Sequence, residues 1–339
     1  MLRLAINGYG RIGRTLLRAL QESPHRDALQ VVAINELADA ATVAHLTRYD
    51  STHGRFPGEV ALQGDSLLVG GNEKRLLRCA NIGELDWAAL GVDMVLECTG
   101  AFTDRATAEG HLAAGASRVL FSQPAESDVD ATIVYGVNHD ALRPEHRVVS
   151  AASCTTNGIT PVIAALDAAF GIEHGTITTI HSAMNDQPVL DAYHHTDLRK
   201  TRAAGQSIIP VDTGLAKGVE RILPALTGRL TAQALRVPTL NVSAMDLTVT
   251  TRTDTDVDAV NAALAAAASD YRGVLGYTEE PLASCDFNRD SRSSIIDACQ
   301  TRVSGPRLVK VLTWFDNEWG YANRMLDVAR YWDALGAAD

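Results

Sequence analysis

The chain has 339 residues, a net charge of −11, and 46% hydrophobic against 21% charged residues. This length suggests about two domains, and the composition is typical of a globular protein with a full core. The acidic balance argues against nucleic acid as a partner, because phosphate backbones require a concentrated basic surface. No apolar stretch approaches the roughly 20 residues of a membrane helix, so we expect no membrane partner either.

The cysteines are odd in number and widely spaced, and no C-x-x-C pair suggests a metal site. The N-terminal sequence MLRLAINGYGRIGR lacks the apolar segment and cleavage site of a signal peptide. We therefore expect reduced thiols in a cytoplasmic protein that holds no metal. The cysteines are Cys79, Cys98, Cys154, Cys285 and Cys299.

The first half of the chain alternates apolar runs with helical patterns. Such alternation predicts βαβ units and a mostly parallel sheet. The predicted strands cover residues 2–7, 29–35, 92–98 and 118–122, and the predicted helices cover residues 11–21, 40–47 and 106–114.

The pattern changes near residue 150, where a helix is predicted over residues 155–170. Longer runs rich in Thr and Val follow, and they indicate strands in a mixed or antiparallel sheet. These strands are predicted at residues 176–181, 230–237, 242–251 and 308–314, with further helices at 256–270 and 320–335.

The predicted fold class is therefore α/β with two domains. Residues 1–150 form a Rossmann-type dinucleotide-binding domain, which a C-terminal helix at 317–339 completes. Residues 151–316 form an α+β catalytic domain with a mixed or antiparallel sheet. No linker or repeat separates the two.

A glycine-rich turn, N-G-Y-G-R-I-G, follows the first strand and opens the first helix. Gly8 permits the tight turn, Gly10 lets the backbone approach a pyrophosphate, and Gly13 allows close packing of helix and strand. The helix N-terminus adds N–H donors and a positive dipole end. The alternative is a plain turn, but its place in a βαβ unit favours a dinucleotide site.

The second strand ends in Asn35 and Glu36. An acidic residue there accepts hydrogen bonds from the ribose hydroxyls of a dinucleotide. No Arg or Lys follows before Arg48, so a 2′-phosphate would meet a repelling carboxylate and no cation. The sequence therefore predicts NAD rather than NADP, with a surface carboxylate of no special role as the alternative.

Cys154 lies in Ser153-Cys154-Thr-Thr-Asn, where a strand turns into a helix. A helix N-terminus stabilises a thiolate, and His181 at the end of a later strand is a candidate base for it. The polar neighbours make an apolar core position improbable for Cys154. The other four cysteines are expected to be inert core residues, as most free cysteines are.

Several residues are candidates for holding a phosphate group. Individually each is an ordinary surface residue, and only their combination suggests an anion site. They are Thr155, Thr213, Gly214, Arg236 and the run Arg199-Lys200-Thr201-Arg202.

Six motifs follow one another along the chain: NGYGRIGR, SCTTN, IHS, IIPVDTG, RVPT and WFDNEWGYANR. With them the sequence resembles the glyceraldehyde-3-phosphate dehydrogenase family over essentially its whole length. The resemblance implies an NAD-dependent aldehyde dehydrogenase that acts through a covalent thiohemiacetal and thioester. It also implies a homotetramer in which the loop at residues 183–207 packs across a subunit interface.

The resemblance implies roles for individual residues. Cys154 is the expected nucleophile and His181 its base. Arg11 and Ile12 line the pyrophosphate, Asn35 and Glu36 the ribose, Thr99 and Ser122 the length of the cofactor, and Asn317 the nicotinamide carboxamide. Ser153, Thr155, Thr213, Gly214, Arg236 and one of Arg199 or Lys200 hold the substrate.

The chain departs from the glycolytic members in an orderly way. They usually read N-D where this chain has Asn35-Glu36, carry a second Cys where it has Gly158, and read H-S-Y/F-T where it has HSAM at 181–184. NELAD, HSAM-x-DQ and QSIIPVDT resemble the erythrose-4-phosphate dehydrogenase branch, which serves pyridoxal 5′-phosphate synthesis in bacteria. That branch implies a small phosphorylated aldehyde, D-erythrose 4-phosphate, as substrate and water as the final acceptor.

Two alternatives stay open. One is the phosphorylating glyceraldehyde-3-phosphate reaction of glycolysis, which a comparison of the three- and four-carbon substrates distinguishes. The other is a non-catalytic NAD- or RNA-binding protein with the same fold. The acidic charge and the intact Cys154 and His181 argue against the second.

Overall fold

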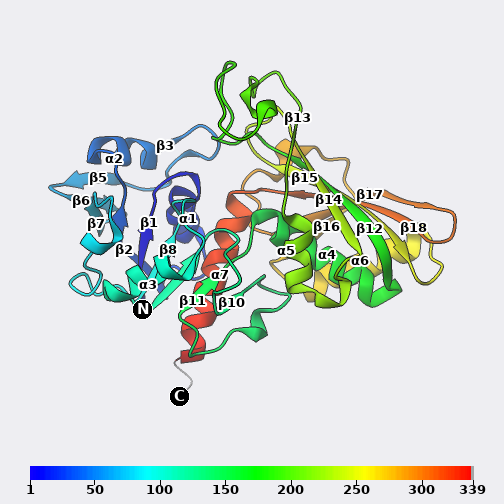
Figure 1. The fold of residues 1–339 in the computed structure, drawn as a ribbon, viewed down its shortest axis with the longest axis horizontal. Coiled ribbons are helices and arrows are strands. Elements are labelled where there is room, and N and C mark those ends of the chain that lie inside the picture. The colour runs from blue at the N-terminus through cyan, green and yellow to red at the C-terminus, as the bar shows by residue number, and fades with distance from the viewer. Residues whose placement is uncertain (337–339) are drawn as a thin grey trace. The chain divides into compact units, whose positions relative to one another are not determined.

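The computed structural model describes residues 1–336, so residues 337–339 of the predicted C-terminal helix lie outside the described residues. The chain divides into two compact units (Figure 1). The first unit comprises Met1–Ser153 and the segment from Ala322 onward, and the second comprises Cys154–Tyr321.

The first unit is built on a nine-stranded sheet in the order β10-β11-β9-β8-β1-β2-β7-β6-β5. The strands from β10 to β7 pair in parallel, whereas β7, β6 and β5 form an antiparallel edge. β1 lies between β2 and β8, and the chain proceeds outward in both directions from there. The bounds are β1 Leu2–Asn7, β2 Leu29–Asn35, β5 Val60–Gln63, β6 Ser66–Val69, β7 Asn72–Leu77, β8 Met94–Glu97, β9 Arg118–Phe121, β10 Ala131–Thr132 and β11 Val148–Ser150.

The helices of this unit are α1 (Arg11–Glu22), α2 (Ala40–Arg48), α3 (Arg105–Ala113) and the part of α7 (Trp319–Gly336) from Ala322 onward. Aspartates cap two of them: Asp39 accepts from the backbone of α2 and Asp104 from that of α3. A capping carboxylate satisfies an otherwise unpaired helical N–H and complements the helix dipole.

The segment between α2 and β7 was not predicted. It contains a small two-stranded sheet, β3 (Tyr49–Asp50) with β4 (Gly54–Arg55), followed by the edge strands β5 and β6. These strands have two to four residues and several exposed positions. The alternation of apolar and polar residues that predicts a strand is therefore too short to recognise in the sequence.

The second unit is built on a seven-stranded sheet in the order β13-β14-β12-β15-β18-β17-β16. β12 pairs in parallel with β14 and antiparallel with β15, so the sheet is mixed. This confirms the predicted fold class of a parallel dinucleotide-binding unit beside a unit with a mixed sheet. The bounds are β12 Ile172–His181, β13 Ile209–Val211, β14 Leu230–Arg236, β15 Ser243–Thr251, β16 Leu275–Thr278, β17 Ser294–Ser304 and β18 Leu308–Phe315.

Three helices of the second unit lie on one face of its sheet: α4 (Cys154–Phe170), α5 (Leu215–Ile222) and α6 (Val257–Asp270) (Figure 1). Their apolar sides and the inward residues of the strands form one core. Burial of this apolar area is the main force that holds helices and sheet together. α5 and β17 were not predicted; α5 is short, and β17 has no simple alternation of buried and exposed residues.

All five cysteines are free thiols, as predicted. The prediction that the four besides Cys154 are core residues is wrong for Cys285 and Cys299, which are exposed, whereas Cys98 is buried. No group of side chains within residues 1–336 has the arrangement of a metal site. The helices of the same range include none that is long and apolar enough to cross a membrane.

Candidate active site

The thiol of Cys154 and the imidazole of His181 meet at one end of the second unit's sheet. α4 begins at Cys154 and β12 ends at His181, and Cys154 Sγ lies 3.8 Å from His181 Nε2. His181 Nδ1 lies 2.8 Å from the carbonyl oxygen of Ser182. A carbonyl only accepts, so Nδ1 carries the proton and Nε2 presents its lone pair to the thiol.

Burial sets the charge state of this pair. It raises the pKa of the Cys154 thiol to about 11, against the opposing effects of the Arg236 guanidinium and the backbone N–H groups of Thr155 and Cys154. Burial and the same guanidinium lower the pKa of His181 to about 4. Burial thus opposes the thiolate expected from the sequence, whereas Arg236 and the backbone N–H groups at the start of α4 favour it. His181 is a neutral base for the thiol.

Arg236 is a cation whose charge acts on both Cys154 and His181. β12 and β14 run in parallel, and His181 is the register partner of Arg236, the last residue of β14. The buried Nε of Arg236 has no hydrogen-bond partner within the described part of the chain. A half-buried guanidinium with an unused donor suits the binding of an anion.

Thr213 and Gly214 precede α5, and Gly214 is its N-cap residue. A Cβ on Gly218, one turn into α5, would lie 2.7 Å from the hydroxyl of Thr156 in the first turn of α4. The two helices therefore pack closely near the start of both. The N-terminus of α5 is thus about one helical turn from the first turn of α4, where its N–H groups favour an anion.

The structure separates Arg199 from Lys200. Lys200 Nζ donates to Asp186 Oδ2 at 2.8 Å, whereas the Arg199 side chain is exposed. Asp186 also interacts electrostatically with Arg236 and His181. Sequence reasoning missed Asp186, because nothing in the spacing of the chain shows which cation its carboxylate would pair with.

Asn317 lies two residues after β18 ends, and two hydroxyls fix its amide. Ser182 Oγ and Ser243 Oγ both donate to Asn317 Oδ1, at 3.0 Å and 2.9 Å. Ser243 Oγ also accepts the backbone N–H of Ser182 at 3.1 Å. Because its oxygen is engaged twice, Asn317 presents its NH₂ group as a donor. Ser243 was not predicted, since it lies just beyond the motif at residues 236–239 and its own surroundings do not distinguish it from an ordinary strand residue.

Ser153 and Thr155 flank Cys154, and both are partly exposed. The N–H of Thr155 contributes a hydrogen bond that favours the thiolate form of Cys154. The structure therefore brings five predicted residues to the start of α4 and the ends of β12 and β14: Ser153, Cys154, Thr155, His181 and Arg236.

The glycine loop of the first unit has the shape that a dinucleotide requires. Gly8 has φ +89°, and a Cβ there would lie 2.5 Å from the backbone nitrogen of Thr99. A Cβ on Gly13 would collide with the carbonyl oxygen of Gly8, whereas one on Gly10 would project into open space. That space is where a pyrophosphate approaches the backbone at the start of α1.

The acidic residue after β2 helps to hold this loop. Glu36 Oε2 accepts the N–H of Tyr9 at 2.9 Å, and Oε1 accepts that of Ala38 at 3.2 Å. A carboxylate offers about four lone-pair positions, so Glu36 retains acceptor capacity for ribose hydroxyls. The Asn35 side chain is engaged below the loop with the backbone of Cys79.

Arg11 and Ile12 begin α1. The Arg11 guanidinium forms two hydrogen bonds with the carboxylate of Asp50, at 2.5 and 3.2 Å. The side chain of Arg11 is thus committed to Asp50, and its backbone is the part that lies at the helix start. The two further cofactor candidates, Thr99 and Ser122, follow the ends of β8 and β9, as expected for a ligand at the carboxyl ends of the strands.

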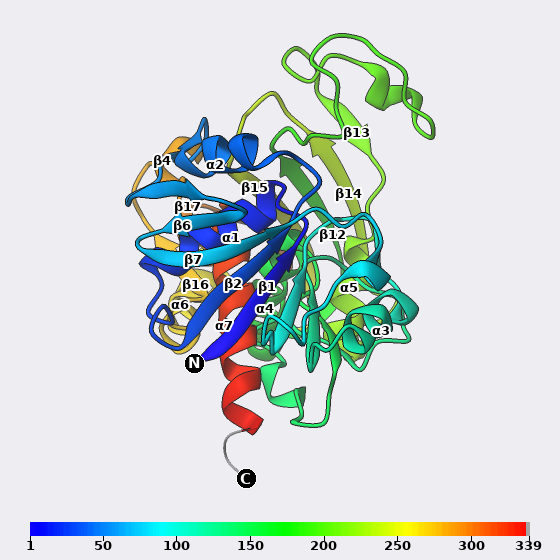
Figure 2. The same ribbon diagram turned by 90° about the vertical axis from the view of Figure 1, so that its left-hand side faces the viewer.

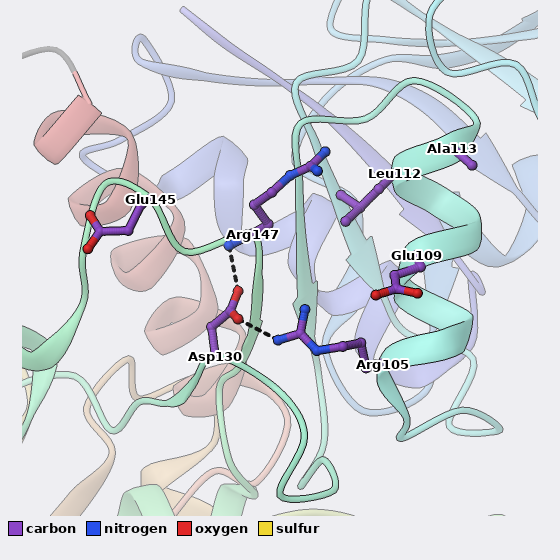
Figure 3. Close-up of a pocket in the computed structure, with 7 residues that line it drawn as sticks. All are labelled: Arg105, Glu109, Leu112, Ala113, Asp130, Glu145 and Arg147. Carbon is purple, nitrogen blue, oxygen red and sulfur yellow. Dashed lines mark hydrogen bonds and ion pairs between the residues drawn. The ribbon is translucent and has the colours of Figure 1, made fainter.

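A surface hollow of about 460 Å³ lies elsewhere on the first unit (Figure 3). Arg105 pairs with Asp130 there, and Glu109 and Glu145 outnumber the remaining cation, Arg147. None of the predicted site residues lines this hollow. Because carboxylates outnumber cations in this hollow and none of the predicted site residues lines it, we do not assign it a part in binding the anionic groups considered above.

Comparison with protein families agrees with the geometry of both units. A profile described as "Glyceraldehyde 3-phosphate dehydrogenase, NAD binding domain" matches residues 2–105. A profile described as "Glyceraldehyde 3-phosphate dehydrogenase, C-terminal domain" matches residues 153–317. The first match confirms the NAD prediction. The protein is therefore an NAD-dependent dehydrogenase that belongs to the glyceraldehyde-3-phosphate dehydrogenase family.

Proposed function

We propose that the protein oxidises D-erythrose 4-phosphate to 4-phospho-D-erythronate, with Cys154 as nucleophile and water as the final acceptor. The observation that carries the covalent chemistry is the contact between the Cys154 thiol and the neutral Nε2 of His181. Covalent catalysis usually depends on a nucleophile and a base within hydrogen-bond reach of each other, and on a third group that orients the base.

The first step is addition of sulfur to the aldehyde. His181 takes the thiol proton as Cys154 Sγ bonds to the aldehyde carbon and then gives that proton to the former aldehyde oxygen, which yields a thiohemiacetal and restores the neutral imidazole. The phosphate of the substrate is held by Arg236 and by the N-terminus of α5 at Thr213 and Gly214. The backbone N–H of Cys154 stabilises the developing oxyanion.

The second step is oxidation of the thiohemiacetal. NAD, when bound, supplies the acceptor for the hydride that leaves the former aldehyde carbon. His181 accepts the hydroxyl proton as the C=O bond forms, so the carbon remains on Cys154 as a thioester. The NH₂ group of Asn317, oriented by Ser182 and Ser243, is a donor suited to the carboxamide oxygen of the nicotinamide.

The third step releases the acid. His181 first releases the proton of the second step to solvent. It then removes a proton from water as the water oxygen bonds to the thioester carbon, the C–S bond breaks, and Cys154 departs as a thiolate that takes the proton back from His181. Met184 stands where a hydroxyl-bearing Thr would help a second anion to bind, and Lys200 is paired with Asp186. Both features weaken binding of inorganic phosphate beside the thioester, and both support water as the acceptor.

Gly158 also supports placing the chain in this branch. It lies one helical turn after Cys154 in α4, and a Cβ there would meet Met245 Cε at 2.6 Å. The space that a second cysteine would need is filled by Met245. The packing of the second unit's core therefore accounts for Gly158 at the position where the glycolytic members usually have a cysteine.

The second candidate is the phosphorylating reaction on glyceraldehyde 3-phosphate, because both matching profiles carry that description. The two are distinguished by the ratio of kcat/KM for the four-carbon and three-carbon aldehyde phosphates under identical conditions. We expect the four-carbon substrate to be preferred at least tenfold. A preference for the three-carbon substrate would overturn the assignment.

We further propose a homotetramer, with the segment at residues 183–207 as a subunit contact. Figure 2 shows this segment extending away from the sheet of its own unit. It carries exposed apolar side chains, which are common at subunit interfaces. Light scattering on the purified protein tests the assembly, and a monomer at micromolar concentration would contradict it. The side chains include Val189, Leu190, Tyr193 and Leu198.

A further inference from the structure

A buried carboxylate lies beneath the glycine loop, in the first unit. Glu97 ends β8 and is fully buried. Its Oε2 accepts from Asn7 Nδ2 at 2.6 Å and from His111 Nε2 at 3.1 Å. Its Oε1 accepts from the N–H of Thr99 at 2.9 Å and from the Thr99 hydroxyl at 2.5 Å. Two donors thus converge on each oxygen.

The hydrogen bond between Asn7 and Glu97 joins two neighbouring strands at the point where the strand order of the sheet reverses. Asn7 ends β1 and Glu97 ends β8, and the strand order proceeds in opposite directions from these two neighbours. Ligands of such sheets bind at this point, outside the carboxyl ends of the strands. The bond therefore joins the two sides of the place where a dinucleotide binds.

The orientation of Asn7 is fixed from the other end of the network. Cys79 N donates to Asn35 Oδ1, and Asn35 Nδ2 donates to Cys79 O, both at 2.9 Å. Because backbone groups cannot exchange donor and acceptor, Asn35 Nδ2 must also face Asn7 Oδ1, at 2.8 Å. Asn7 is then left with its NH₂ toward Glu97.

The tautomer of His111 is fixed in the same way. Trp87 Nε1, which can only donate, lies 3.1 Å from His111 Nδ1. Nδ1 is therefore an acceptor, and the ring proton sits on Nε2, facing Glu97. His111 and Trp87 are both fully buried, so no water replaces either partner without rearrangement.

An acceptor-only group is thus required at position 97. Burial raises the pKa of Glu97, but the hydrogen bonds from His111, Thr99 and Asn7 outweigh it, so the pKa lies below its usual range. The donors of Asn7 and His111 are each oriented by a neighbour that cannot change, and the N–H of Thr99 belongs to the backbone. Such fully satisfied networks make a buried site rigid.

The network is joined directly to the glycine loop. Gly8 N donates to Asn35 O at 2.9 Å, and Cys98 N donates to Asn7 O at 2.7 Å. A Cβ on Gly8 would meet the backbone of Thr99, so loop and network are in contact. A change in the position of Thr99 or Asn7 therefore moves Gly8.

We infer that Glu97 is a positioning residue for NAD: locked between Asn7, Thr99 and His111, it holds the glycine loop in the form that binds the pyrophosphate. It acts through the loop and touches no reacting atom. This role depends on the NAD-binding domain and not on the aldehyde substrate. A negative result for Glu97 therefore leaves the proposed reaction unaffected, and a different substrate leaves the role of Glu97 unaffected.

The test is the Glu97→Gln variant, which retains the shape and removes the charge. If its amide oxygen faces Thr99, its NH₂ group meets the NH₂ of Asn7 and the Nε2–H of His111. If it is turned over, its NH₂ group meets the N–H of Thr99. We expect the Kd for NAD, measured by titration calorimetry, to rise at least tenfold.

Controls separate positioning from general loss of structure. Glu109→Gln makes the same change at an exposed position of α3, the helix that carries His111, and should leave the Kd for NAD within twofold. The alkylation rate of Cys154, followed by mass spectrometry of its peptide in the absence of NAD, should be unchanged in Glu97→Gln, since Cys154 begins the other unit. A purely structural role would lower the melting temperature without changing the Kd of the folded protein.

A double variant tests the tautomer directly. In Glu97→Gln with Trp87→Phe, His111 is free to move its proton to Nδ1 and accept from the new amide. Where the amide oxygen faces Thr99, the double variant removes the conflict with His111 while that with Asn7 remains, so it should bind NAD more tightly than Glu97→Gln alone but less tightly than the parent. A Kd within twofold of the parent in folded Glu97→Gln would overturn the inference. Should Glu97→Gln not fold, Asn7→Ala removes one donor only; a threefold or greater rise in Kd supports the inference and an unchanged Kd contradicts it.

Discussion

Gly158 provides a test of how tightly the core behind Cys154 is packed. The change is Gly158→Cys, which introduces the second cysteine usual in the glycolytic members. A Cβ at this position would lie 2.6 Å from Met245 Cε and 3.2 Å from the carbonyl oxygen of Ser293. The Met245 methyl group can move aside, but the carbonyl belongs to the backbone and can move little.

Two opposing effects determine the magnitude. Replacing Gly by a residue with a Cβ in a helix interior stabilises by up to about 1 kcal/mol. Overpacking a filled core costs about 1–3 kcal/mol, and a thiol adds a second heavy atom in the same space. We therefore expect Gly158→Cys to lower the free energy of unfolding by about 1–2 kcal/mol.

The assay is urea unfolding followed by circular dichroism, with Gly158→Ala as the matched variant that adds the Cβ alone. Gly158→Ala should be less destabilised than Gly158→Cys. Adding Met245→Val to Gly158→Cys removes the atom in conflict, so the pair should be less destabilised than the sum of the single changes. A Gly158→Cys protein as stable as the parent, or additive effects in the pair, would refute the packing argument.

Two further predictions concern the residues around the nucleophile. The pKa of His181 is about 4 in the folded protein against 6.5 ordinarily, so protons favour the unfolded chain and stability falls between pH 6.5 and 4, by about 3 kcal/mol in total. Urea midpoints across this range should show a weaker pH dependence in His181→Gln, and an unchanged dependence would contradict the assignment. Ser243→Ala leaves the buried N–H of Ser182 without its acceptor and removes a donor to Asn317, so the same assay should show a loss of about 1–3 kcal/mol; a loss below about 0.5 kcal/mol would contradict it.

The local motifs were the part of the molecule that sequence could predict. Gly8 adopts a positive φ and Gly13 packs against the carbonyl of Gly8, so both meet a demand within a few residues of chain that the pattern makes visible. The start of α4 at Cys154 and the end of β12 at His181 were predicted for the same reason. These features depend on the geometry of a few neighbouring residues, and the same turn requires the same residue types wherever it occurs.

Long-range partners could not be predicted. The Asp186–Lys200 pair, the two hydroxyls on Asn317, and the contact of Glu97 with Asn7 join residues that no spacing rule connects. The effect of burial on the Cys154 thiol could not be predicted either, since burial depends on the whole fold while the helix dipole is local. Sequence therefore indicated candidate residues and left their environment undetermined.

The central claim is a thioester on Cys154 that water resolves. Its most direct test is ³¹P NMR of the products formed from D-erythrose 4-phosphate and NAD with millimolar inorganic phosphate present. The account predicts one phosphomonoester signal, from 4-phospho-D-erythronate, with the inorganic phosphate signal unchanged. An acyl phosphate signal that grows in step with NADH and consumes inorganic phosphate would contradict it.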